Sequence, residues 1–311
     1  MRKNSTNQLR AVESENMTIK QKILSNNCIV KFLKYLHNTY WEILMQFWKV
    51  RPLTFGTEKL NNNFSIGIVT YVDRYDRFFK PLITNLVKIF PDTEFVVAVN
   101  GYYDKDLQHR YLAEINAFLL KFKNVKVIAF VDAQSLSKLW NLCIVHSTSP
   151  KTMILNDDIK IKTTFRKELT ASGALQEDIA LINRSWSHFI ISKRIIVKNG
   201  WFDERFPGVG NEDEDYEARL CVNGIAVETF RVRALKNVVF ITLNFSYGKN
   251  IATVNTKYVR QNKIFFDSKW EMSVHERPGF VYVPIIRQYV RLNPGMDTPS
   301  FYDGNGSARN K

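Results

Sequence analysis

The stretch FSIGIVTYV, residues 64–72, decides the fold of this 311-residue chain. It is rich in β-branched residues and is bounded by polar ones, which is typical of a buried strand. Similar apolar runs follow at 94–101 (EFVVAVNG), 125–132 (VKVIAFVD) and 151–161 (KTMILNDDIKI). The four runs therefore predict four strands of one sheet.

Helical patterns separate these predicted strands. Apolar residues recur with helical spacing over 81–90, 107–122 and 135–147, and Ser135 is a typical N-cap for the last of these helices. Strand and helix thus alternate along 64–161, which predicts an α/β fold with a mostly parallel sheet flanked by helices. Ligands of such sheets bind beyond the carboxyl ends of the strands.

Composition divides the rest of the chain. Residues 1–60 combine a polar tail with an amphipathic helix predicted over 28–50, and 61–292 form the main domain. The helix at 28–50 is too polar for a confident membrane span; it either packs on the main domain or lies in a membrane interface. Residues 293–311 are rich in Pro, Gly, Asp, Asn and Ser, which predicts a loose tail.

The net charge of +14 favours anionic partners such as phosphorylated small molecules or an anionic membrane surface. Nucleic acid is not expected, because the sequence has no zinc-finger spacing and no aromatic RNA-binding signature. The three cysteines, Cys28, Cys143 and Cys221, are too far apart for a metal or redox motif. This composition fits a cytoplasmic protein, with peripheral attachment to a membrane as an option.

The first acidic motif, ILNDDIK, brings Asn156, Asp157 and Asp158 to the end of a predicted strand. In extended backbone, Asn156 and Asp158 share one face and Asp157 points to the other. Oxygen ligands on one face suit a divalent ion such as Mg²⁺ or Mn²⁺. The alternative is an ordinary turn, because Asn and Asp favour turns.

The second acidic motif lies in GWFDERFPGVGNEDEDYEARL, residues 200–220, where four acidic residues occupy 212–215. Asn211 and Glu214 match a capping box, and carboxylates at a helix start are stabilised by the helix dipole. Capping accounts for one or two of the four charges. The repulsion among all four predicts a compensating cation or a catalytic role, such as a general base with a raised pKa.

Together, ILNDDI and the motif at 200–220 resemble the GT-A class of nucleotide-sugar glycosyltransferases. The similarity spans roughly 64–235 and is greatest to family 2-like inverting enzymes and to the galactosyltransferase-type "ED" motif. The resemblance implies a Rossmann-like GT-A catalytic domain with a donor half at about 61–160 and an acceptor half at about 161–292. It also implies metal-assisted, inverting transfer of a sugar from a nucleoside-diphosphate sugar to a hydroxyl of a glycan or lipid-linked acceptor.

The resemblance assigns roles to individual residues. Asp213 matches the catalytic base, Glu212 and Gly210 the acceptor-binding positions, and Asp158 the main metal ligand, with His275 as the candidate for a late histidine ligand. The positions that match nucleotide-sugar contacts are Thr70, Tyr71, Arg74, Asn100, Ser137, Asn141, Asn156 and Asp157.

Two alternatives stay open at this point. Asn156 stands at the first position of the DxD-like motif, so one alternative is a nucleotide-sugar-binding adaptor without turnover. A sugar nucleotidyltransferase would also use a doubly wound sheet and paired acids. It would usually show a glycine-rich loop after the first strand, whereas TYVDRYDRF at 70–78 has no glycine.

Overall fold

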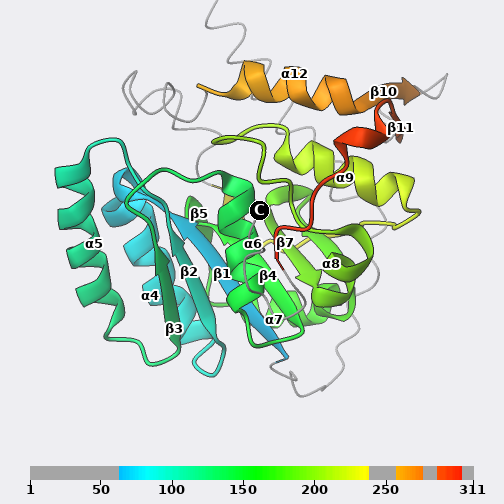
Figure 1. The fold of residues 1–311 in the computed structure, drawn as a ribbon. Helices are drawn as coiled ribbons and strands as arrows, with labels where there is room; N and C mark the ends of the chain where they lie inside the picture. The colour runs from blue at the N-terminus through cyan, green and yellow to red at the C-terminus, as the bar shows by residue number, and fades with distance from the viewer. Residues whose placement is uncertain (1–62, 238–256, 276–285, 303–311) are drawn as a thin grey trace, which may run out of the picture. The chain divides into compact units, whose positions relative to one another are not determined.

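The computed structural model describes residues 63–237, 257–275 and 286–302 (Figure 1). The chain divides into two compact units, Met1–Pro52 and Leu53–Lys311, and every described residue belongs to the second. The amphipathic helix predicted over 28–50 therefore lies outside the described residues. None of the described helices has the length and apolar character needed to cross a bilayer.

The described part of the chain forms a sheet of seven strands in the order β3-β2-β1-β4-β7-β6-β8. The first four strands in sequence run parallel, as the sequence predicts, while β7 is antiparallel to both β4 and β6, and β8 is parallel to β6. The strand bounds are β1 Phe64–Thr70, β2 Phe95–Val99, β3 Val125–Ala129, β4 Lys151–Asn156, β6 Ile179–Ile182, β7 Ser185–Ser192 and β8 Glu228–Phe230.

Three helices connect the parallel strands: α4 Lys80–Ile89, α5 Lys105–Leu119 and α6 Leu136–His146. Each lies within two or three residues of its predicted bounds, and the Ser135 hydroxyl caps α6 by accepting a hydrogen bond from the backbone N–H of Lys138. A short 3₁₀ turn, η1 Val72–Arg74, and a π turn, η2 Tyr75–Phe79, join β1 to α4. The predicted α/β fold, a mostly parallel sheet flanked by helices, is confirmed.

Alternate strand residues build a core on each face of the sheet. On one face, Ile66 and Ile68 pack with α4, α5 and α7 (Phe165–Ser172). On the other, Val96 and Ile154 pack with α6, α8 (Lys193–Asn199) and α9 (Glu212–Val222). Gly67 lets α6 approach closely, because a Cβ there would lie 2.7 Å from the Cβ of Cys143.

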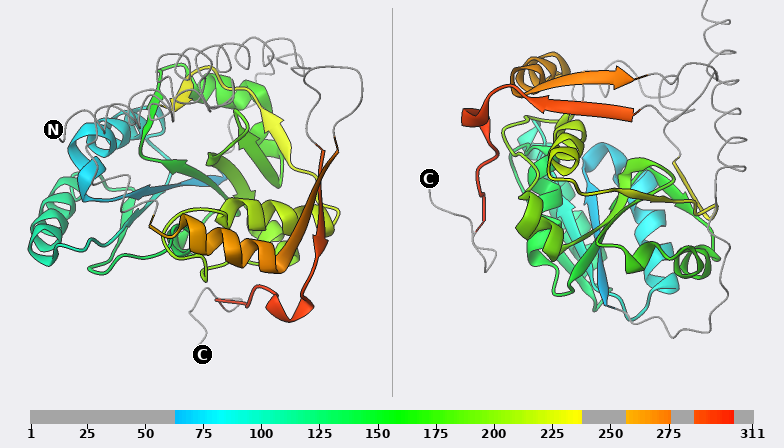
Figure 2. Two further views of the ribbon diagram at one scale, coloured as in Figure 1. Left: turned by 90° about the horizontal axis from the view of Figure 1, so that it is seen from above. Right: turned by 90° about the vertical axis from the view of Figure 1, so that its right-hand side faces the viewer.

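The later part of the chain adds a further layer beside α9 (Figure 2). Helix α12 (Val259–Lys269) leads into an antiparallel pair, β10 (Trp270–His275) and β11 (Ile286–Arg291). Their apolar side chains form a third core around Phe206, Phe266 and Trp270. The remaining short elements are β5 Ile159–Ile161, paired with β9 Leu235–Asn237, and the 3₁₀ turns η3 Ala174–Gln176 and η4 Pro294–Met296.

Residues 293–302, which the sequence predicts to be loose, pack against the segment 201–205. The guanidinium of Arg205 donates to the carbonyl oxygens of Met296 (2.9 Å) and Asp297 (3.0 Å), and the Tyr302 hydroxyl donates to Glu204 Oε1 (2.6 Å). These contacts depend on polar side chains from a distant segment. They leave no periodic pattern in the tail sequence, so composition alone misses them.

Candidate functional site

A cavity of about 1120 Å³ lies beyond the carboxyl ends of β1, β2 and β4. This is the edge of a doubly wound sheet at which ligands bind. Five of the predicted nucleotide-sugar residues line it: Tyr71, Arg74, Asn100, Asn156 and Asp157. The structure therefore brings residues from three separate strand ends to one cavity.

An arginine bridges the two aspartates after β4. Nη1 of Arg74 lies 2.8 Å from Asp157 Oδ1 and 3.1 Å from Asp158 Oδ2, and both carboxylates are almost fully buried. Burial raises the pKa of Asp157 to about 6 in spite of this ion pair, and burial also raises the pKa of Asp158. Two carboxylates and one guanidinium leave the group one negative charge in excess when all are ionised.

The oxygens left over in this group suit a divalent ion. Asn156 Oδ1, Asp157 Oδ2 and Asp158 Oδ1 are buried and lack hydrogen-bond partners among the described residues. They are hard oxygen donors on consecutive residues beside an uncompensated negative charge, so these side chains fit Mn²⁺ or Mg²⁺. No group of three or more His, Cys, Asp or Glu side chains that could hold a metal ion is present in the described ranges, so further ligands would come from water or substrate oxygens.

The two residues predicted as metal ligands are Asp158 and His275, and the structure describes the side chain of Asp158 alone. Asp158 belongs to the buried group but does not line the cavity. His275 ends β10, and its side chain lies outside the described part of the structure. Its role as a metal ligand stays a prediction.

Asn100 and Asn141 use their amides to hold loops. Oδ1 of Asn100 accepts from the backbone N–H of Gln134 (2.8 Å), and its Nδ2 donates to the Gln134 carbonyl (3.2 Å). Asn141 is buried away from the cavity and bonds both the N–H and the carbonyl of Phe202, at 3.0 and 2.9 Å. Each asparagine fixes a segment that contributes to the cavity wall.

Thr70 and Ser137 do not reach the cavity. Both side chains are fully buried, and neither hydroxyl has a hydrogen-bond partner within the described ranges. Their positions at a strand end and a helix start are as predicted, but their side chains point into the protein.

The cavity also contains an aromatic pair, Tyr102 and Tyr103, that was not predicted from the sequence. The rings of Tyr102 and Tyr103 lie 4.1 Å apart, and the Tyr102 hydroxyl donates to Asp73 Oδ2 at 2.9 Å. Tyr103 is 64% exposed, so its outer face is open to a flat ligand. The only signal in the sequence was the Tyr-Tyr pair directly after the predicted strand end Asn100-Gly101.

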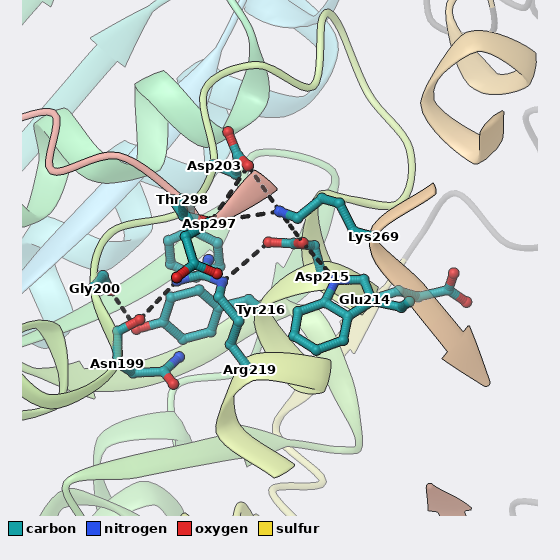
Figure 3. Close-up of polar contacts among 12 residues, drawn as sticks. Asn199, Gly200, Asp203, Glu214, Asp215, Tyr216, Arg219, Lys269, Asp297 and Thr298 are labelled. Atoms are coloured by element: carbon teal, nitrogen blue, oxygen red, sulfur yellow. Dashed lines mark hydrogen bonds and ion pairs between the residues drawn. The ribbon is translucent and has the colours of Figure 1, made fainter. Parts of the chain in front are cut away.

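The last acid of the run at 212–215 is structural. Asp215 is fully buried and accepts from Arg219 Nε (3.1 Å), Lys269 Nζ (2.5 Å) and Trp270 Nε1 (2.9 Å). Figure 3 shows Lys269 between Asp215 and Asp203, whose Oδ2 lies 2.9 Å from Lys269 Nζ. The charge of Asp215 is therefore compensated by two cations, Arg219 of α9 and Lys269 of α12. A compensating cation was one of the two explanations that the sequence predicted for the acidic run.

The other three acids organise the start of α9. Glu212 accepts from the backbone N–H of Gly210, and Asp213 Oδ1 accepts from the N–H of Glu214 at 2.9 Å. The predicted capping box is wrong. Asn211 has a left-handed backbone (φ +66°), and its amide donates to the Glu214 carboxylate (2.6 Å) instead of capping the helix.

Burial is the main cause of the pKa shifts of Glu212 and Asp213, the two residues that match the "ED" motif. It raises the pKa of Glu212 to about 8, with the neighbouring Asp213 as a second cause, and it also raises the pKa of Asp213. Gly210, Glu212 and Asp213 do not line the cavity, whereas the preceding residues Pro207, Gly208 and Val209 do. The predicted acceptor-side residues thus follow directly on a cavity-lining loop.

The fold and the cavity define an α/β protein with a large cavity at the carboxyl edge of its sheet. No protein-family model matches the chain, and no curated protein matches it. Solved structures do match at low similarity. One is S. aureus TarS 1–349 in complex with UDP, with 16% identity and a TM-score of 0.42, covering 55% of this chain and 57% of that chain.

A second match is GalNAc-T7 with UDP, GalNAc and Mn²⁺, with 10% identity and a TM-score of 0.42. It covers 56% of this chain and 43% of that chain, so the chain spans less than two thirds of either structure. Similarity at this level says nothing about the substrates of this chain. The evidence for its function comes from the cavity and the residues around it.

Proposed function

We propose that the chain is a nucleotide-sugar glycosyltransferase of the GT-A type, which moves a sugar from a nucleoside-diphosphate sugar to a hydroxyl of a glycan or lipid-linked acceptor. The observation that carries this proposal is the cavity at the ends of β1, β2 and β4, with Arg74 and Asp157 in its wall. Its volume of about 1120 Å³ is large enough for a nucleotide sugar.

The cavity lining supports a donor of this kind. The open face of Tyr103 suits a nucleobase, because aromatic rings stack on bases. Lys138 and Lys257 bring positive charge to the cavity, which favours a diphosphate. The net charge of +14 would raise the rate at which such an anionic donor arrives.

A divalent ion completes the proposed donor site. Asp158 and Asp157, together with the amide oxygen of Asn156, would hold Mn²⁺ or Mg²⁺. When bound, such an ion neutralises the diphosphate and makes it a better leaving group. Arg74 keeps the two carboxylates together by pairing with both.

Inversion follows from a single displacement. Asp213 accepts the proton of the acceptor hydroxyl as that oxygen bonds to the anomeric carbon and the bond from this carbon to the diphosphate breaks. The raised pKa of Asp213 suits a general base, and Glu212 and Gly210 would contact the acceptor. The loop 207–209, which joins the cavity to α9, supports a site shared by these residues.

Thermal unfolding with a panel of nucleotides tests the donor site. The full chain is heated alone and with UDP, GDP and their sugar conjugates, with Mn²⁺ or with EDTA. We expect at least one nucleotide sugar to raise Tm, because a ligand that binds only the folded state stabilises it. Unchanged Tm with every donor, with and without Mn²⁺, would contradict the proposal.

A nucleotide-sugar-binding adaptor is the second candidate, favoured by the position of Asp213 outside the cavity lining. The substitution Asp213→Asn separates the two. A transferase loses turnover by two to four orders of magnitude and still binds UDP. An adaptor shows no donor turnover in either form.

A further inference from the structure

Glu204 is the second carboxylate of the cavity. Among the described residues, only Asp157 and Glu204 bring carboxylates to its lining. Asp157 is committed to the ion pair with Arg74. Glu204 has no ion pair within the described ranges, so its charge is open to a ligand.

Two donors fix the orientation of Glu204. Its Oε1 accepts from the Tyr302 hydroxyl at 2.6 Å and from Asn141 Nδ2 at 3.0 Å. Asn141 is itself fixed by Phe202, and Tyr302 is only 5% exposed. Within the described residues Oε2 has no hydrogen-bond partner, so one oxygen of a firmly held carboxylate stays free.

Aromatic rings accompany this carboxylate. Phe301 and Tyr302 line the cavity, and the Tyr302 ring meets Trp201 edge-on with centroids 4.9 Å apart. A carboxylate oxygen accepts hydrogen bonds from hydroxyl groups, and an aromatic face packs against the C–H groups of a sugar ring. The combination fits a pyranose better than a phosphate, which Glu204 would repel.

We propose that Glu204, Tyr302 and Phe301 form the acceptor-sugar subsite of the cavity, in which Glu204 Oε2 accepts a hydrogen bond from an acceptor hydroxyl. This inference rests on the proposed function, and it gives the segment 286–302 a part in substrate binding. The acceptor is then a glycan with an exposed neutral sugar, bound by a carboxylate outside the "ED" motif.

Ligand-observed NMR tests the subsite with defined probes. Methyl glycosides of common hexoses are added to the full chain with UDP and Mn²⁺, and saturation transfer to each glycoside is measured. We expect transfer to at least one glycoside. Glu204→Gln should weaken that binding about tenfold, because a charge-assisted hydrogen bond is lost, while the Kd for UDP stays within twofold.

Two further variants distinguish a specific role of Glu204 from a general effect of substitution. Tyr302→Phe keeps the ring and removes the hydroxyl that holds Glu204, so glycoside binding should weaken less than in Glu204→Gln. Glu114→Gln is the matched control, because Glu114 is largely exposed on α5 and pairs with Lys80; it should behave like the wild type. Circular dichroism confirms that each variant is folded.

Several outcomes would overturn the inference. Glu204→Gln could bind glycosides like the wild type, or the UDP-bound wild type could bind none of them. A loss of affinity for a UDP-sugar relative to UDP would assign Glu204 to the donor sugar instead. Failure of the wild type to bind any nucleotide would count against the proposed function itself.

Discussion

Lys269 and Asp215 form a buried ion pair, with Nζ 2.5 Å from Oδ1, and Lys269 also reaches Asp203 Oδ2 at 2.9 Å. All three side chains are at most 4% exposed. One lysine from the end of α12 thus joins the acidic start of α9 to the segment whose next residues, Glu204 and Arg205, line the cavity. The C-terminal layer is therefore part of the framework of the site.

Replacing Lys269 by Met should destabilise the protein by about 3–5 kcal/mol, because it leaves two buried carboxylates without their shared cation. Urea unfolding measures this change. Lys263→Met is the matched control on the same helix, since Lys263 is 52% exposed and pairs with Asp267 at the surface. We expect the control to cost less than about 1 kcal/mol. Equal effects of the two substitutions would contradict the structural role of Lys269.

Stability should fall as pH rises from about 4.5 to 8. Glu212 has an ordinary pKa of 4.5 that the fold raises to about 8, and Asp157 is raised from 3.8 to about 6. At these two carboxyls the folded state holds more protons than the unfolded chain between those values, so their titration favours unfolding as the pH rises. Burial lowers the pKa of His188 from 6.5 to about 4, and this single group opposes the two carboxyls below pH 6.5. Each unit of pKa difference corresponds to about 1.4 kcal/mol.

Urea unfolding at pH 5 and pH 8 measures this dependence. Glu212→Gln should make the stability change over this range smaller, because the amide does not titrate. Glu114→Gln should leave it as in the wild type, since Glu114 is largely exposed. An unchanged pH dependence in Glu212→Gln would show that Glu212 is not the group responsible.

The proposed metal site predicts a chelator effect on nucleotide binding. EDTA should weaken UDP binding by the wild type about tenfold or more, because Asp157 and Asp158 would hold a cation that offsets the negative charge of the diphosphate. Asp158→Asn should bind UDP weakly with or without Mn²⁺. Asp76→Asn is a suitable control, since the Asp76 side chain is 80% exposed. Calorimetric titration gives these affinities, and tight UDP binding in EDTA would argue against the metal.

The segment 1–60 should bind anionic membranes, if its predicted helix at 28–50 is interfacial. The full chain is then expected to cosediment with vesicles that contain phosphatidylserine, and deletion of 1–60 should abolish this. High salt should weaken the binding of the full chain. A full chain that stays in the supernatant would favour the alternative, a helix packed on the main domain.

The sequence predicted the parallel strands β1 to β4 and the helices between them, because strand and helix periods reflect which side chains face the core. It also placed Asn156, Asp157 and Asp158 at a strand end, and the structure puts two of them in the cavity lining. It did not predict the antiparallel strand β7 between β4 and β6. A strand that is buried on both faces has a continuous apolar sequence, and this sequence is the same whether the strand runs parallel or antiparallel to its neighbours.

Local pattern by itself thus determined the α/β fold and the edge of the sheet at which the cavity lies. Only the tertiary structure decided which polar groups meet: Lys269 with Asp215, Tyr302 with Glu204, and Asn100 with the Gln134 backbone. The physical reason is that periodicity records burial against a common core, which neighbouring residues share. An ion pair or hydrogen bond joins two atoms that the chain brings together only after the core has formed.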